Sequence, residues 1–146
     1  MQFELLTLTG AKFSGEAAQV NLVTADGAMG ILPNHEPFKA IAMPGPVTVK
    51  RKDGHSVTFA MFGGLLEVRK EGVRLLADEA EHEDELIRNE IELALKQAET
   101  LKAAAKDKRE LSRAQELVDR ETVRLGVARM RRRDGGARPD RPQPPQ

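Results

Sequence analysis

The sequence predicts an α+β chain in which a small β-sandwich is followed by an antiparallel hairpin of two helices. The composition changes near residue 78, since all five Phe and 9 of the 12 Gly lie before it. After that point the chain is rich in Ala, Leu, Glu, Lys and Arg, and it has no Pro until Pro139. The first set of residues favours strands and turns, and the second favours helices. We therefore expect a β-sandwich domain at 1–78, a helical hairpin domain at 79–133 and a disordered Pro- and Arg-rich tail at 134–146.

The first domain contains short apolar runs that alternate with other residues and are separated by turns. The runs at 47–49 and 57–61 have the hairpin signal Lys52-Asp53-Gly54 between them. The runs at 66–68 and 73–77 are joined in the same way at Glu71-Gly72. Further strands are expected at 2–8, 18–24, 30–32 and 38–42, with Gly10 and Gly15 near the bends. About seven to ten short strands of this kind predict a small sandwich or barrel.

Two series of apolar residues in the second domain recur at steps of three and four, which is typical of one helix face. The first comprises Ile87, Ile91, Ala94, Ala98, Leu101 and Ala105; the second comprises Leu111, Ala114, Val118, Leu125 and Ala128, with Glu121 and Thr122 as an interruption. Acidic residues at 79–85 favour the N-terminal end of the first helix. Asp107 and Glu110 have the spacing of a capping box that starts the second helix. Because the break is short, the two helices must be antiparallel.

The apolar series contain many alanines, and this bears on whether the hairpin moves. Alanine buries little surface, and burial contributes only about 25 cal/mol per Å². We therefore expect the hairpin to be held weakly, which makes it a candidate movable element. The alternative is a helical pair docked permanently on the first domain, and the periodicity is compatible with both.

The net charge is zero, but the charges are segregated along the chain. Residues 78–92 contain 8 acidic side chains and 1 basic one, while residues 124–146 contain 7 basic and 2 acidic side chains. In an antiparallel hairpin these two segments lie at the same end. They can attract each other there or be offered separately to other proteins.

The sequence contains none of the patterns that carry catalysis or bind a cofactor. It has no Cys, which excludes disulfides and thiolate metal sites, and its three His are far apart. Phosphate-binding loops, zinc-protease motifs and nucleophile elbows are absent. No apolar run is long enough to cross a membrane, and the N-terminus lacks the features of a signal peptide. We expect a non-enzyme with no catalytic residues, no cofactor and no metal.

Five motifs, taken in order, resemble the epsilon subunit of bacterial F-type ATP synthases. They lie at 13–16 (FSGE), 30–38 (GILPNHEPF), 44–47 (PGPV), 63–68 (GGLLEV) and 73–78 (VRLLAD). The resemblance covers residues 1–133 and implies a ten-stranded β-sandwich followed by the hairpin. It also implies a non-catalytic rotor subunit of the central stalk, which couples ion translocation through the c ring to ATP synthesis. Such a subunit is peripheral, at the cytoplasmic face of the bacterial cell membrane.

The partners implied by the resemblance are the gamma subunit, the c-subunit ring and the beta and alpha subunits. The hairpin of the family moves between compact and extended forms, and the extended form inhibits ATP hydrolysis. The motif at 30–38 places a loop near the c ring and gamma, with contact residues Pro33, Asn34, His35, Glu36 and Phe38. An alternative role for His35 is to stabilise the loop itself. Asn34 stands where the family often has Gly, and asparagine can adopt the same left-handed backbone.

Two further sets of residues follow from the resemblance. Arg113, Arg120 and Arg124 lie on one side of the second helix and are expected to contact the beta subunit, although a solvated basic face is the simpler alternative. Glu85 and Arg88 align with a nucleotide-binding motif of the family, but most of that motif is missing, so we expect no ATP binding.

A second hypothesis of a different class follows from the basic C-terminus. The chain would then be a free-standing adaptor that binds an anionic partner such as RNA, and its binding would weaken strongly with salt.

Overall fold

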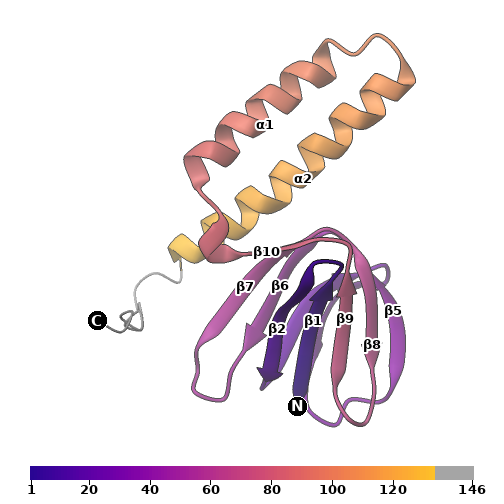
Figure 1. Ribbon diagram of the computed structural model, residues 1–146, viewed down its shortest axis with the longest axis vertical. Helices are drawn as coiled ribbons and strands as arrows, with labels where there is room; N and C mark the ends of the chain where they lie inside the picture. Colours follow the sequence, from indigo (N-terminus) through magenta and orange to yellow (C-terminus); the bar gives the residue numbers. More distant parts are fainter. Residues whose placement is uncertain (134–146) are drawn as a thin grey trace.

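Residues 1–133 form ten strands and two long helices in the computed structural model, and these are the residues that the structure describes (Figure 1). The strands are β1 (Gln2–Thr7), β2 (Gly10–Glu16), β3 (Gln19–Thr24), β4 (Gly27–Ile31), β5 (Phe38–Ala42), β6 (Gly45–Lys50), β7 (Ser56–Met61), β8 (Gly64–Val68), β9 (Val73–Ala77) and β10 (Ala80–His82). The helices are α1 (Arg88–Ala103) and α2 (Lys108–Arg133), with a 3₁₀ turn, η1 (Glu83–Glu85), before α1. The predicted α+β class is confirmed, and the predicted tail at 134–146 lies outside the described residues.

One continuous hydrogen-bonded path runs through the sheet in the order β10-β7-β6-β3-β5-β8-β9-β1-β2, and β4 pairs with β3. Every pair is antiparallel except that of β1 with β9, which is parallel. The sheet folds over so that its two ends face each other. Phe13 of β2 contacts Phe59 of β7, with ring centroids 6.3 Å apart. This closure makes the sandwich visible in Figure 1.

The core between the layers is apolar, as the alternating runs predict. Along β9, Val73, Leu75 and Ala77 are buried while Arg74 and Leu76 face outward. The largest completely buried side chains of the sandwich are Phe3, Leu5, Ile31, Phe59, Met61, Leu66 and Leu75. Each such side chain contributes about 1.5–3 kcal/mol when it is removed from water.

Two expectations for the sandwich need correction. Gly15 lies inside β2 rather than at a bend. The sequence did not indicate β2 because five of its seven residues are exposed or polar at the surface, so the apolar alternation is missing. The sheet also continues past residue 78, since Ala80 of β10 pairs with Met61 of β7.

We expected the acidic residues at 79–85 to lie at the start of the first helix, and this expectation is wrong. They belong to β10, η1 and the residue before β10, and Glu90 is the acidic residue in the first turn of α1. The sheet holds this segment instead, through the pairing of β10 with β7 and a bond to a side chain. The Thr58 N–H donates to the Glu83 carboxylate at 3.2 Å, and the Asp84 N–H donates to the His82 ring at 3.0 Å.

The second helix begins as predicted. The Asp107 carboxylate accepts the Glu110 N–H at 2.8 Å, and the Glu110 carboxylate accepts the Lys106 N–H at 2.9 Å. This is a capping box in which Glu110 bonds to the N–H of Lys106, the residue before Asp107, rather than to the N–H of Asp107 itself. The helix then continues without a break through Glu121, which is 7% exposed and pairs with Arg124. The interruption in the apolar series is therefore filled by an ion pair.

The hairpin stands on one end of the sandwich, and its helix–helix connection points away from the sheet (Figure 1). The C-terminal half of α2 lies against β7. A second apolar cluster forms there from Ala60, Leu86, Ile91, Leu125 and Val127. In contrast, Leu101, close to the helix–helix connection, is more than half exposed. The large buried side chains of the hairpin therefore lie near the sandwich.

Two glycines, Gly64 in the sheet and Gly126 in a helix, test how closely each element is packed. A Cβ at Gly64 of β8 would overlap the Leu76 carbonyl oxygen and lie 2.9 Å from Ala77 Cα. A Cβ at Gly126 of α2 would meet nothing within 4 Å. We expect Gly64→Ala to lower the free energy of unfolding by about 1–3 kcal/mol, and Gly126→Ala to raise it by up to about 1 kcal/mol. Urea denaturation measures both, and equal midpoints for the two variants would contradict the packing described here.

Candidate functional site

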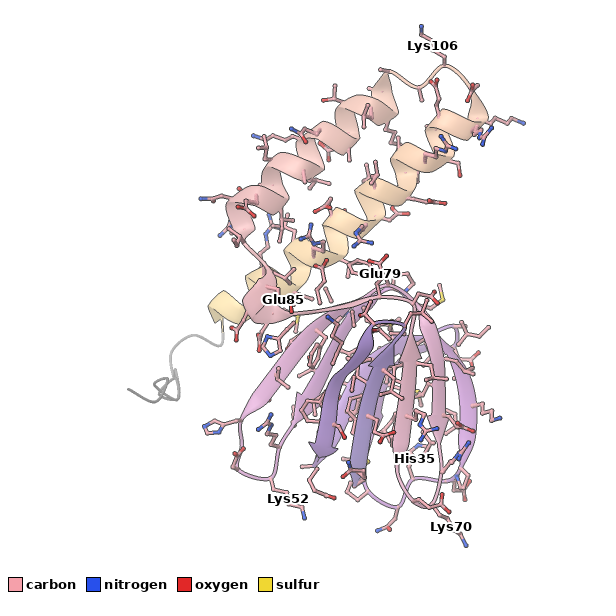
Figure 2. The ribbon with its side chains drawn as sticks, viewed as in Figure 1. His35, Lys52, Lys70, Glu79, Glu85 and Lys106 are labelled. Carbon is pink, nitrogen blue, oxygen red and sulfur yellow. The ribbon has the colours of Figure 1, made fainter. Side chains whose placement is uncertain are left out.

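The loop at 32–37 joins β4 to β5 at the end of the sandwich opposite the hairpin. Figure 2 places His35 and Lys70 at this end and Glu79 and Glu85 beside the helices. Pro33, Asn34, His35 and Glu36 are exposed, whereas Phe38 is half-buried and packs on the core. Four of the five predicted loop residues therefore lie together on one exposed surface. Phe38 packs partly on the core and so also helps to hold the loop in place.

The conformation of the loop is fixed by local interactions. Asn34 has a φ of 64°, which confirms that asparagine takes the left-handed backbone expected there. The His35 N–H donates to the Leu32 carbonyl at 3.2 Å, and its Nδ1 lies 2.9 Å from the Glu36 carbonyl oxygen. The His35 ring also lies 5.1 Å from the Phe38 ring. These contacts support the loop-stabilising role of His35, and its exposure leaves the ring accessible to a partner.

A shallow recess beside this loop is lined by the turn between β8 and β9. Arg69 and Lys70 supply positive charge there, next to Leu32 and Met1. The Arg69 guanidinium donates to Glu67 at 2.8 Å, and this bond lowers the pKa of the Glu67 carboxyl and raises the pKa of Arg69. Glu67 therefore stays ionised and partly neutralises the cations. The recess also includes His35 and Glu36 of the loop, so it joins charged groups of both signs to the exposed loop surface.

An exposed apolar row crosses the outer face of the sandwich, and sequence reasoning missed it. Ile41 of β5 pairs with Leu65 of β8, Leu65 pairs with Leu76 of β9, and Leu76 pairs with Leu6 of β1. Their exposed fractions are 62% for Ile41, 42% for Leu65 and 44% for Leu76. Contiguous exposed apolar surface of this kind marks a protein–protein contact.

A signal for this row does exist in the sequence. The pairs Leu65-Leu66 and Leu75-Leu76 are consecutive apolar residues within strands, and one member of each pair must face outward. A parallel row of alternating charge lies beside the apolar row. Lys39 is 3.5 Å from Glu67, and Arg74 is 3.1 Å from Glu4. The outer face therefore combines apolar area with fixed charges, as a subunit interface does.

The three arginines predicted to contact a partner differ in their surroundings. Arg113 is exposed and forms no ion pair within residues 1–133. Arg120 lies 2.6 Å from Glu79, and Arg124 lies 2.8 Å from Glu81. The hydrogen bond from Arg120 is the main cause that lowers the pKa of Glu79. Arg120 and Arg124 therefore contact the chain itself in this conformation, and only Arg113 is presented freely.

The predicted nucleotide contacts, Glu85 and Arg88, do not form a nucleotide pocket. Glu85 is exposed on η1, while Arg88 begins α1 and donates to Glu92 at 2.9 Å. The guanidinium that would bind phosphate is thus already engaged with a carboxylate. Within residues 1–133 no three His, Cys, Asp or Glu side chains come together as a metal site. No helix of this part is long and apolar enough to cross a bilayer.

ATP binding by the purified chain is a direct test of this arrangement. We expect equilibrium dialysis against ATP to detect no binding up to about 1 mM, because Glu92 neutralises Arg88 and competes with phosphate. The matched variant Glu92→Gln frees Arg88 and shows whether that carboxylate is the obstacle. Millimolar or tighter binding by the unsubstituted chain, lost in Arg88→Ala, would contradict the expectation.

Comparisons with known proteins agree with the resemblance found in the sequence. Residues 1–83 match the family model described as ATP synthase, Delta/Epsilon chain, beta-sandwich domain. The ATP synthase epsilon chain of Herpetosiphon aurantiacus is 37% identical over 132 residues, which are 90% of this chain and 96% of the relative. That of Neisseria meningitidis is 37% identical over 120 residues, covering 81% of this chain and 85% of the relative.

Two solved structures share the fold. A chain of the Euglena gracilis mitochondrial ATP synthase superposes with a TM-score of 0.76 at 22% identity, covering 88% of this chain and 79% of that one. A chain from the central stalk and c ring of the Tetrahymena thermophila mitochondrial ATP synthase gives a TM-score of 0.60 at 11% identity, with coverage of 88% and 96%. These comparisons give no support to the hypothesis of a free-standing RNA-binding adaptor.

Proposed function

The chain belongs to the ATP synthase delta/epsilon family, and from this premise we propose that it acts as a rotor subunit of the central stalk. An epsilon chain of this family is a non-catalytic subunit of ATP synthase. The proposed role is to couple ion translocation through the c ring to ATP synthesis. The complex would hold the chain at the cytoplasmic face of the bacterial cell membrane.

The observation that carries this proposal is the separation of the contact surfaces. The loop at 32–37 lies at one end of the sandwich, the hairpin stands on the other, and the apolar row crosses the face between them. A chain with contact surfaces at both ends can connect two other components of a complex. We assign the loop, through Pro33, Asn34, His35, Glu36 and Phe38, to the c ring and gamma. The apolar row is assigned to gamma, and the hairpin to the beta and alpha subunits.

Affinity purification of the full-length tagged chain from its own cells tests this role. We expect gamma, beta and c subunits to be recovered together, as identified by mass spectrometry. The double variant Leu65→Gln/Leu76→Gln should reduce this recovery at least about tenfold, because two exposed apolar contacts are lost from an interface. Its thermal stability should change little, since both side chains already face solvent.

The matched control is Leu8→Gln, which removes an exposed leucine outside the row; Leu8 is 99% exposed. Recovery with this control should equal that of the unsubstituted chain. If no ATP synthase subunit is recovered with the unsubstituted chain, the proposed function is refuted. If recovery with the double variant is full, the proposed function stands but the apolar row is not one of its contact surfaces.

Arg113 provides a test of the regulatory part of the proposal. If the hairpin inhibits ATP hydrolysis through a contact of Arg113 with the beta subunit, Arg113→Gln should raise the ATPase rate of the assembled complex. The expected rise is up to about fivefold, which corresponds to the loss of one ion pair worth about 1 kcal/mol. Arg120 and Arg124 are unsuitable for this test because they also contact Glu79 and Glu81. Lys12→Gln, an equal charge change on exposed β2, is the control.

An unchanged ATPase rate in Arg113→Gln would eliminate the inhibitory contact at this position. The coupling role would remain, because the loop at 32–37 and the apolar row do not involve Arg113.

A further inference from the structure

Four neighbouring strands of the sandwich, β5, β8, β9 and β1, carry two rows of outward-facing side chains; the strands lie side by side in Figure 1. The first is the apolar row described above, which consists of Ile41, Leu65, Leu76 and Leu6. The second, the charged row, lies two residues away along each strand and consists, in the same strand order, of Lys39, Glu67, Arg74 and Glu4. Neighbours within each row are direct cross-strand partners, so both rows cross all four strands.

The sign of the charge alternates along the charged row. From β5 to β1 the residues are basic, acidic, basic and acidic. Within the chain, Lys39 Nζ lies 3.5 Å from Glu67 Oε1. Arg74 Nε lies 3.1 Å from Glu4 Oε2. The side chains of Lys39, Arg74 and Glu4 are nevertheless 69%, 46% and 33% exposed. A second surface can therefore reach a row whose charges already sum to zero.

An alternating row of this kind is complementary to its own reversed copy. A twofold axis parallel to the strands, between β8 and β9, places a second copy of the chain face to face with the first and reverses the order of its strands. Lys39 of one protomer then faces the partner's Glu4, and Glu67 faces the partner's Arg74. By symmetry, each of these contacts occurs twice. The same axis lays one apolar row on the other, with Leu65 against the partner's Leu76 at the centre.

Other face-to-face arrangements of two copies lack this complementarity. A twofold axis along the charged row keeps the order of the strands, so that Lys39 would face the partner's Lys39 and Glu4 the partner's Glu4. An axis between the two rows would cover charged side chains with leucines and remove them from water without a new partner. The favoured axis also leaves the strands of the two sheets aligned, which is a common way for sheets to pack.

The size of the face indicates a weak association. Four strands of about five residues make a face about 19 Å wide and about 17 Å long. Even with the side chains that project from it, such a face is smaller than the roughly 800 Å² that each partner contributes to a standard stable interface. We therefore expect a dissociation constant on the order of 10 µM or weaker, so that the association depends on concentration.

We propose that the free chain forms a weak twofold dimer through the apolar and charged rows. The dimer covers Leu65 and Leu76 when no other subunit does so. The apolar row is also the surface assigned above to gamma, so dimerisation and gamma binding exclude each other. This last step rests on the proposed function, whereas the dimer itself follows from the face alone. Chains in excess of gamma are then held as dimers, and mass action returns them to monomers when gamma becomes available.

Sedimentation velocity of the purified full-length chain tests the dimer. Between about 1 µM and about 300 µM, a range that spans the expected dissociation constant, the weight-average sedimentation coefficient should rise from the monomer value toward the dimer value. Leu65→Gln/Leu76→Gln should remain monomeric, because the centre of the interface becomes polar. A monomer at every concentration of the unsubstituted chain would overturn the inference. The proposed function would be unaffected, since recovery of gamma, beta and c subunits requires no self-association.

Two charge reversals test the geometry of the dimer. Lys39→Glu alone puts two carboxylates opposite each other at both ends of the charged row, and Glu4→Lys alone puts two ammonium groups there. Each variant should raise the dissociation constant about tenfold. An equimolar mixture of the two variants pairs opposite charges again, and it should dimerise about as strongly as the unsubstituted chain.

Glu99→Lys, a charge reversal at an exposed position of α1, is the matched control and should leave dimerisation unchanged. Circular dichroism shows whether each variant is folded. Full dimerisation of either single variant, or a mixture that stays as weak as its components, would overturn the twofold arrangement. If a charge variant does not fold, the leucine double variant still decides whether this face forms the interface.

Purified gamma subunit tests the exclusion between the two partners. Gamma added in equal amount to the dimer should give a complex that contains one copy of this chain. A complex with two copies per gamma would overturn the shared use of the face. Failure of gamma to bind at all would contradict the proposed function, and with it the exclusion, while the dimer itself would stand.

Discussion

The parallel pairing of β1 with β9 is the constraint on which the rest of the sandwich depends. It joins Phe3 to Val73 and Leu5 to Leu75, residues that are 70 positions apart in the chain. The pairing brings β2 across from β7, so that Phe13 meets Phe59 and the core closes. It also determines both surfaces assigned to partners. Leu6 joins the apolar row only because β1 lies beside β9, and Met1 reaches the recess at the loop for the same reason.

The parts of this fold that could be predicted from the sequence are those in which burial follows a regular period. Val47 and Val49 alternate with less buried neighbours in β6 and are buried as expected. In β7 the alternation is lost, because Ala60 is buried beneath the hairpin as well as Phe59 in the core. β2 could not be predicted in this way because it lies at the end of the sheet path with most side chains exposed. Its position depends on the long-range pairing with β1, which no local pattern encodes.

The same distinction separates the candidate surfaces that could be predicted from the sequence from those that could not. The loop containing His35 was found from a local motif, and its left-handed Asn34 could be expected from residue type. The apolar row and the ion-pair cluster both require knowledge of which strands and helices are neighbours. The acidic segment illustrates the difference. Its charge was evident, but Glu79 and Glu81 neutralise Arg120 and Arg124 rather than the dipole of α1, because β10 holds them beside α2.

Two acidic and two basic side chains neutralise one another at the junction between sandwich and hairpin. Apolar contact is non-directional and would allow the helices to slide, whereas the fork of a guanidinium fits its carboxylates in few orientations. Arg120 lies seven residues after Arg113 along α2, and Arg124 lies four residues after Arg120. The same side of the helix therefore carries the exposed Arg113 away from the sheet and the two paired arginines against it. A partner that attracted Arg120 or Arg124 would have to replace Glu79 or Glu81. Binding of such a partner and docking of the hairpin on the sandwich would then compete for the same charges.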